Sequence, residues 1–109
     1  MPKITEEQLA KVKAAHAGVE LHLLEADPWD EDIIVRVPPE ASWSKWQANR
    51  ADPETRRGAQ KDLVNECLVF PSHVELAAIC DRRPALLEEF AGGCCKIAGV
   101  IQSVKLKKL

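Results

Sequence analysis

The sequence predicts an α+β fold that is mostly α, with an N-terminal helix and a two-stranded β-hairpin packed on a bundle of about four helices. An alternating segment, 19–23, and a β-branched segment, 33–37, flank an acidic turn and indicate the hairpin. Capping and proline signals mark repeated helix starts after it. The 109 residues suffice for one domain, 1–109, with the helix and hairpin in 1–37 and the helical part in 38–109.

The N-terminal elements follow from local signals. Thr5 opens a capping-box pattern and Gly18 is a natural helix stop. In the alternating strand that follows, Leu21 and Leu23 are expected on the buried face and His22 on the open face. The acidic residues of the turn are expected to be solvated: Glu25, Asp27, Asp30, Glu31 and Asp32.

Prolines divide the rest of the chain into helices. Pro39 is placed in the first turn of one helix, and Asp52-Pro53 is an N-cap followed by a proline at the first helical position. That second helix is expected to run through Leu68 to a stop at Pro71. Ser72 caps a third, short helix.

The last helix is expected to begin at Pro84 and to be the longest. Its apolar residues recur at spacings of three and four, as in a coiled-coil seam: Leu87, Phe90, Cys94, Ile97, Ile101 and Val104. Small residues at Ala91-Gly92-Gly93 and Ala98-Gly99 let another helix approach closely. They indicate either packing within the chain or a docking surface, and both interpretations stay open.

Composition argues against several classes of protein. A net charge of −2 predicts no general attraction to nucleic acid or to anionic membranes. No apolar run approaches the roughly 20 residues that span a bilayer. The N-terminal residues lack an apolar stretch of signal-peptide type, so a cytoplasmic protein is expected.

A small nucleic-acid-binding regulator is one alternative. The helix pair between Ser72 and Phe90, joined at residues 80–83, resembles a helix-turn-helix. The first turns of the second helix would have to read base edges, yet they offer Glu88 and Glu89 and no Arg, Lys, Asn or Gln. The sequence therefore disfavours nucleic acid as a partner.

A thiol or zinc site is the second alternative. Zinc sites usually pair their ligands within one loop. Cys67 and Cys80 lie far apart, and the adjacent Cys94 and Cys95 point about 100° apart on a helix. We therefore expect cysteines that pack as small apolar residues, with no metal and no cofactor.

No enzyme is predicted either. No histidine is spaced to activate a thiol, and the pair Gly92-Gly93 follows no strand, as a phosphate-binding loop would require. We expect no catalytic residues and no small-molecule substrate. The residues expected to bind a protein partner are instead aromatic, small or on the seam: Trp29, Trp43, Trp46, Phe90, Gly92, Gly93, Ile97 and Ile101.

Several segments together resemble a known family. They are Val35-Arg36-Val37-Pro38, then Trp43 and Trp46, then Leu63 to Pro71, then Glu75-Leu76, Pro84 and Gly99. This pattern is similar to that of small phage proteins described as tail assembly chaperones. The resemblance covers most of the chain between Glu20 and Gly99, and its motifs are structural. The Cys94-Cys95 pair and the acidic turn with Trp29 depart from the pattern.

The resemblance implies a non-enzymatic role in phage or prophage tail morphogenesis, in the cytoplasm of a bacterial host. Such chaperones are thought to coat the tape-measure protein, keep it soluble and yield to tail-tube subunits. Implied partners are therefore the tape-measure protein and the tail-tube protein, and the seam of the last helix is compatible with self-association. The family supplies no catalytic residue and no cofactor to carry over.

Overall fold

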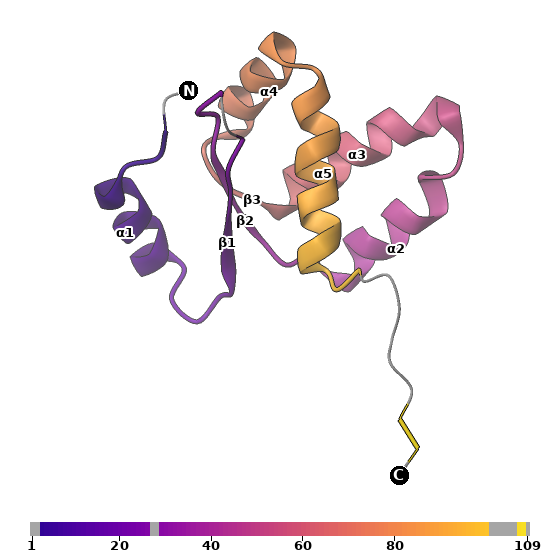
Figure 1. Ribbon diagram of the computed structural model, residues 1–109, viewed down its shortest axis with the longest axis horizontal. Coiled ribbons are helices and arrows are strands. Elements are labelled where there is room, and N and C mark those ends of the chain that lie inside the picture. Colours follow the sequence, from indigo (N-terminus) through magenta and orange to yellow (C-terminus); the bar gives the residue numbers. More distant parts are fainter. Residues whose placement is uncertain (1–2, 27–28, 101–106, 109) are drawn as a thin grey trace.

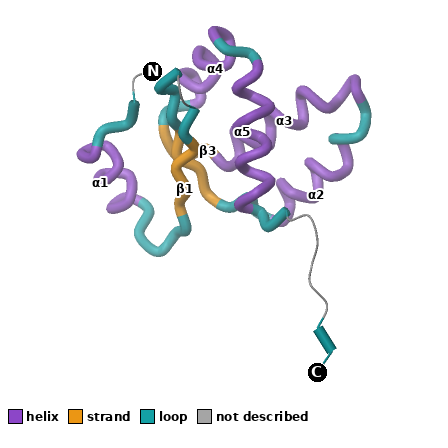
Figure 2. Tube along the Cα trace, in the orientation of Figure 1, coloured by secondary structure: helices purple, strands orange, loops and turns teal. Residues whose placement is uncertain are grey.

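The computed structural model describes residues 3–26, 29–100 and 107–108. The elements of this part of the chain are, in order, α1 (Glu6–Ala15), β1 (Leu21–Leu24), β2 (Ile33–Arg36), α2 (Glu40–Asn49), α3 (Pro53–Cys67), β3 (Leu68–Phe70), α4 (His73–Arg82) and α5 (Ala85–Ile97). The predicted α+β, mostly α fold class is confirmed, with four helices after the hairpin (Figure 1, Figure 2).

The helices start where their caps predict. Thr5 and Gln8 form a reciprocal capping box, in which Thr5 Oγ1 accepts the Gln8 N–H at 3.1 Å and Gln8 Oε1 accepts the Thr5 N–H at 3.0 Å. Asp52 Oδ1 and Ser72 Oγ accept backbone N–H groups of α3 and α4 at 2.9 Å and 3.2 Å. Pro53 occupies the first turn of α3.

The sheet has one strand more than the sequence predicts. Leu68 leaves α3 with extended dihedral angles, φ −63° and ψ 128°, so the helix does not continue to Pro71. The next residues form β3, in which Leu68 lies opposite Val35 and Phe70 opposite Ile34. The strand order is β1-β2-β3, both pairs are antiparallel, and β2 is therefore the central strand.

The central strand is buried on both faces, which its β-branched sequence suits. Ile33 and Val35 belong to the main core, together with buried residues of α2, α3, α4 and α5. Ile34 is also buried but lies outside that cluster. In Figure 1 the sheet stands between α1 on one side and helices α2, α3 and α5 on the other.

The burial of β1 differs from the predicted alternation. Leu24 packs against the main core, whereas Leu23 is 40% exposed. His22 is half-buried and lies 2.7 Å from Glu20 Oε2 through its Nε2 atom. The expectation that Leu23 would be buried was therefore wrong, because the packing of α5 selects the side of the strand that carries Leu24.

The last helix is shorter than expected. It has 13 residues against 15 in α3, and Gly99 ends it with a φ of +106°. The Gly99 N–H donates to Lys96 O and the Val100 N–H to Cys95 O, both at 3.1 Å, which is a Schellman motif. Gly99 is thus a helix terminator rather than part of a small-residue face. Ile101 and Val104 lie outside the described residues.

Two acids of the turn are buried, contrary to expectation. Glu31 and Asp32 are 8% and 1% exposed. Arg82 Nη2 donates to Glu31 Oε1 at 2.9 Å, so the turn is tied to the end of α4. The α4 helix includes Arg82, which leaves a shorter joint before α5 than the one predicted at residues 80–83. Asp27 lies outside the described residues.

Candidate functional site

A hollow of about 690 Å³ lies between β1 and α5, and we call it the β1–α5 groove. It is lined by Leu23, Leu24, Glu25, Ala26, Trp29, Ala85, Leu86, Glu89, Phe90, Gly92, Gly93 and Lys96. Four residues predicted to bind a partner therefore meet there, from segments far apart in the chain: Trp29, Phe90, Gly92 and Gly93.

The groove has a buried apolar floor and an exposed apolar wall. Leu86 and Phe90 project from α5 into the core and are 6% and 3% exposed. Leu23 and Trp29 also line the groove, and they are 40% and 48% exposed. Large apolar side chains that stay in solvent beside a hollow are typical of interaction sites.

The two adjacent glycines of α5 have different roles. A Cβ atom on Gly93 would lie 2.9 Å from Leu24 Cδ1, so this glycine lets β1 approach the helix. A Cβ atom on Gly92 would meet nothing within 4 Å. Gly93 therefore fits the interpretation of packing within the chain, while Gly92 leaves open space in the groove.

The Trp29 ring is held from one side by a cation. The Arg83 guanidinium carbon lies 3.8 Å from the ring centroid. Such a contact contributes about 0.5–1 kcal/mol at an exposed site. Charged side chains surround the apolar wall: Glu25, which pairs with Lys3 at 3.5 Å, and also Glu89 and Lys96.

The other aromatic and seam residues predicted to bind a partner lie elsewhere. Trp46 is 8% exposed and belongs to the core. Trp43 and Ile97 are half-buried and pack against that core. None of these three lines the groove, and Ile101 is outside the described residues.

The cysteines pack mainly as apolar residues. Cys67 of α3 and Cys94 of α5 are fully buried, and Cys80 and Cys95 are half-buried. The hydrogen bond with Cys67, together with burial, raises the pKa of Cys94 far above its usual range. Burial also raises the pKa of Cys80 and of Cys95. Thiols with raised pKa values are poor nucleophiles at neutral pH.

The alternatives gain no support from the site geometry. Within the described ranges, no three His, Cys, Asp or Glu side chains gather in a way that could hold a metal ion. In the first turns of α5, Leu86 and Leu87 are buried, and the exposed side chains include the carboxylates Glu88 and Glu89. Carboxylates at that position would repel phosphates. No helix in the described part of the chain is both long and apolar enough to cross a membrane.

Sequence reasoning missed two features. The first is the exposure of Leu23, which alternation places on the buried face. The prediction failed because alternation cannot reveal which side of a strand a distant helix covers. A second hollow, between α3 and α4, was also missed. Its polar residues Arg57, Lys61 and Asn65 recur every four positions on α3, which is a signal that could have indicated it.

Comparisons with known proteins place the fold but no function. No family model and no curated protein matches the chain. A solved structure described as the uncharacterised protein RBSTP2171 from Bacillus stearothermophilus is similar, with a TM-score of 0.76 and 17% sequence identity. The similarity covers 91% of this chain and 99% of that one. The chain therefore shares its fold with a protein from Bacillus stearothermophilus.

Proposed function

We propose that the chain is a non-enzymatic tail assembly chaperone of phage type, which holds an apolar helical segment of the tape-measure protein in the β1–α5 groove. The observation that carries the proposal is the exposed pair Leu23 and Trp29 beside the buried floor of Leu86 and Phe90. A groove with aromatic and leucine side chains suits an amphipathic helix. Tail-tube subunits and further copies of the chain are proposed as later partners.

The chemistry of the lining supports binding rather than catalysis. Among the described residues, its polar side chains are Glu25, Glu89 and Lys96, and the lining includes no histidine, cysteine, serine or threonine. A hydroxyl or thiol nucleophile paired with a histidine base would need two such groups. The resemblance to the chaperone family points in the same direction.

The rim charges indicate how a client helix would be oriented. Glu89 and Lys96 lie seven residues apart on α5, at opposite ends of two helical turns. A client with a basic residue near Glu89 and an acidic residue near Lys96 would complement both charges. Such pairs would fix the direction of the client more than its affinity.

The experiment is co-expression of the tagged chain with segments of the tape-measure protein encoded in the same genome, followed by pull-down. Gly92→Leu fills the open part of the groove, and Trp29→Ala removes its wall. Gly58→Leu is the matched control, because Gly58 is also helical, and a Cβ atom added to it would meet nothing within 4 Å, but it lines a different hollow.

We expect the wild-type chain and Gly58→Leu to retain a tape-measure segment, and Gly92→Leu and Trp29→Ala to lose at least about tenfold in affinity, or 1.4 kcal/mol. Circular dichroism would show that all four proteins are folded. Retention of every segment by Gly92→Leu, or capture of no segment by the wild-type chain, would refute the proposal.

A further inference from the structure

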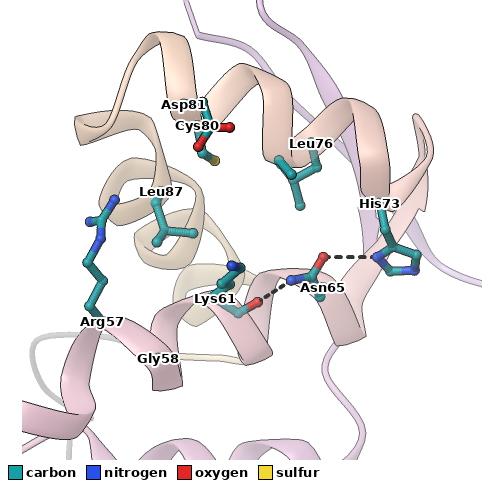
Figure 3. A pocket seen from close by; sticks show the side chains of 10 residues that line it. Arg57, Gly58, Lys61, Asn65, His73, Leu76, Cys80, Asp81 and Leu87 are labelled. Atoms are coloured by element: carbon teal, nitrogen blue, oxygen red, sulfur yellow. Dashed lines mark hydrogen bonds between the residues drawn. The ribbon is translucent and has the colours of Figure 1, made fainter.

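The second hollow, which we call the α3–α4 hollow, is built from different residues than the β1–α5 groove. It has a volume of about 690 Å³ and lies between α3 and α4 beside the start of α5 (Figure 3). Among the described residues, its lining shares none with the lining of the groove. The two hollows can therefore be tested with separate substitutions.

One wall of this hollow is polar and held in position. Arg57, Lys61 and Asn65 recur every four residues along α3, so they lie on one side of the helix. Asn65 Nδ2 donates to Lys61 O at 2.8 Å, and its Oδ1 atom accepts from His73 Nδ1 at 2.9 Å. Figure 3 shows this chain of contacts linking α3 to the start of α4.

The two cations of this wall have no acidic partner among the described residues. Lys45 and Arg82, on other parts of the bundle, pair with Asp62 and Glu31 at 3.3 Å and 2.9 Å. No such ion pair involves Arg57 or Lys61 within residues 3–26, 29–100 and 107–108. Two unpaired cations on one helix face create a positive potential, which a carboxylate ligand would lower.

The floor of the hollow is apolar. Leu76 of α4 and Leu87 of α5 line it and are 3% and 4% exposed. Figure 3 shows both side chains directed into the space between the helices. A ligand with an apolar group beside its negative charge would therefore match both the floor and the polar wall.

We propose that the α3–α4 hollow binds an acidic, leucine-containing segment of a protein partner. Leucine side chains of the segment lie over Leu76 and Leu87, and its carboxylates lie against Arg57 and Lys61. A nucleic acid strand fits less well, because its phosphate groups would leave the apolar floor of Leu76 and Leu87 unfilled.

The test uses the full chain and a fluorescent peptide of about 14 residues, long enough to be partly helical, with glutamate and leucine on one face. Fluorescence anisotropy measures its binding, and a second peptide carries glutamine in place of glutamate. Arg57→Glu and Lys61→Glu reverse the charges of the wall. Arg56→Glu is the matched control, since Arg56 is exposed on the same helix and does not line the hollow.

We expect saturable binding of the acidic peptide that is weakened at least about tenfold by Arg57→Glu, by Lys61→Glu and by raised salt. Arg56→Glu should change it less than about twofold, and Gly58→Leu should obstruct it while leaving tape-measure binding intact. The glutamine peptide and inorganic phosphate should fail to compete.

Three results would overturn the inference. The first is no binding of the acidic peptide up to about 1 mM. The second is equal weakening by Arg56→Glu and Arg57→Glu, which would indicate a general charge effect. The third is tighter binding of a single-stranded oligonucleotide than of the peptide, with loss of both in Arg57→Glu, which would identify the hollow as a nucleic-acid site. If the wild-type chain bound the acidic peptide but no tape-measure segment, the proposed function would be refuted and the α3–α4 site would still hold.

Discussion

Adjacent residues of the same type can have different structural roles, as Gly92 and Gly93 do. Alanine in a helix interior is favoured over glycine by about 0.8–1 kcal/mol. At Gly92 nothing opposes that gain, but at Gly93 the new methyl group would press on Leu24. Local sequence does not separate the two positions, because the difference lies in what β1 brings to the helix.

We expect Gly92→Ala to raise the free energy of unfolding by about 0.5–1 kcal/mol. Gly93→Ala should be less stable than Gly92→Ala by about 1 kcal/mol or more, because Leu24 has to move. Urea denaturation followed by circular dichroism measures both. Equal stabilisation by the two substitutions would show that β1 does not pack on Gly93.

The buried carboxylate of Glu31 makes stability depend on pH. Burial alone would raise its pKa, but cationic neighbours, including the hydrogen-bonded Arg82, lower the pKa below the ordinary value of 4.5. A carboxyl group with a lowered folded-state pKa stabilises the fold above its unfolded-state pKa. That stabilisation is lost as the pH falls through the folded-state value.

We therefore expect Glu31→Gln to be less stable than the wild-type chain at pH 7. The difference should shrink as the pH is lowered below 4.5, because the wild-type carboxyl group then becomes protonated. Denaturation curves between neutral and acidic pH measure this. A difference that is constant over the whole range would contradict the assigned ion pair.

The thiols should differ in reactivity according to their burial. Iodoacetamide at neutral pH is expected to modify Cys80 and Cys95 slowly, since burial raises their pKa values. Cys67 and Cys94 should react only after opening of the interface between α3 and α5, about 10³-fold more slowly. Peptide mass spectrometry resolves the four sites. Modification of Cys94 before Cys80 would show that the interface opens readily.

At the scale of elements, helix starts are predictable and strand partners are not. Thr5, Asp52 and Ser72 cap their helices through contacts within the next three residues, so the sequence contains the whole signal. β3 depends on Ile34 and Val35 of a distant strand. Leu68-Val69-Phe70 is therefore as compatible with a helix end as with a strand when only the sequence is considered.

The end of α5 shows how a regular pattern can mislead. The apolar spacing of three and four continues past Gly99, and this predicts a longer helix. The positive φ of Gly99 and its Schellman hydrogen bonds end the helix regardless of that spacing. A glycine at such a place is a stronger signal than the periodicity around it.

For the whole molecule, the candidate site could be predicted only in part. Sequence alone identifies Trp29 and Phe90 as unusual, but their meeting in one groove depends on how β1 packs on α5. The exposure of Leu23 and the existence of the hollow between α3 and α4 also depend on long-range packing. Residue types were therefore predictable, whereas their juxtaposition was not.

The main core and α1 are expected to differ in stability. Val12 is the one residue of α1 that is buried, and a helix of 10 residues is marginal on its own. We expect amide protons of α1 to exchange at least about 100-fold faster than those of α3 and α5. Hydrogen exchange followed by mass spectrometry measures this. Equal protection would mean that α1 unfolds only with the core.

The insertion of β3 between two helices, against a strand from the hairpin, means that the chain cannot be divided cleanly where the helical part begins. A fragment of residues 1–37 would lack β3, one of the two neighbours of β2, and a fragment of residues 38–109 would contain β3 without the strand it pairs with. Each piece should be unfolded alone, yet the two should reassemble when mixed. The protein would then serve as a split reporter that signals the proximity of whatever is fused to its halves.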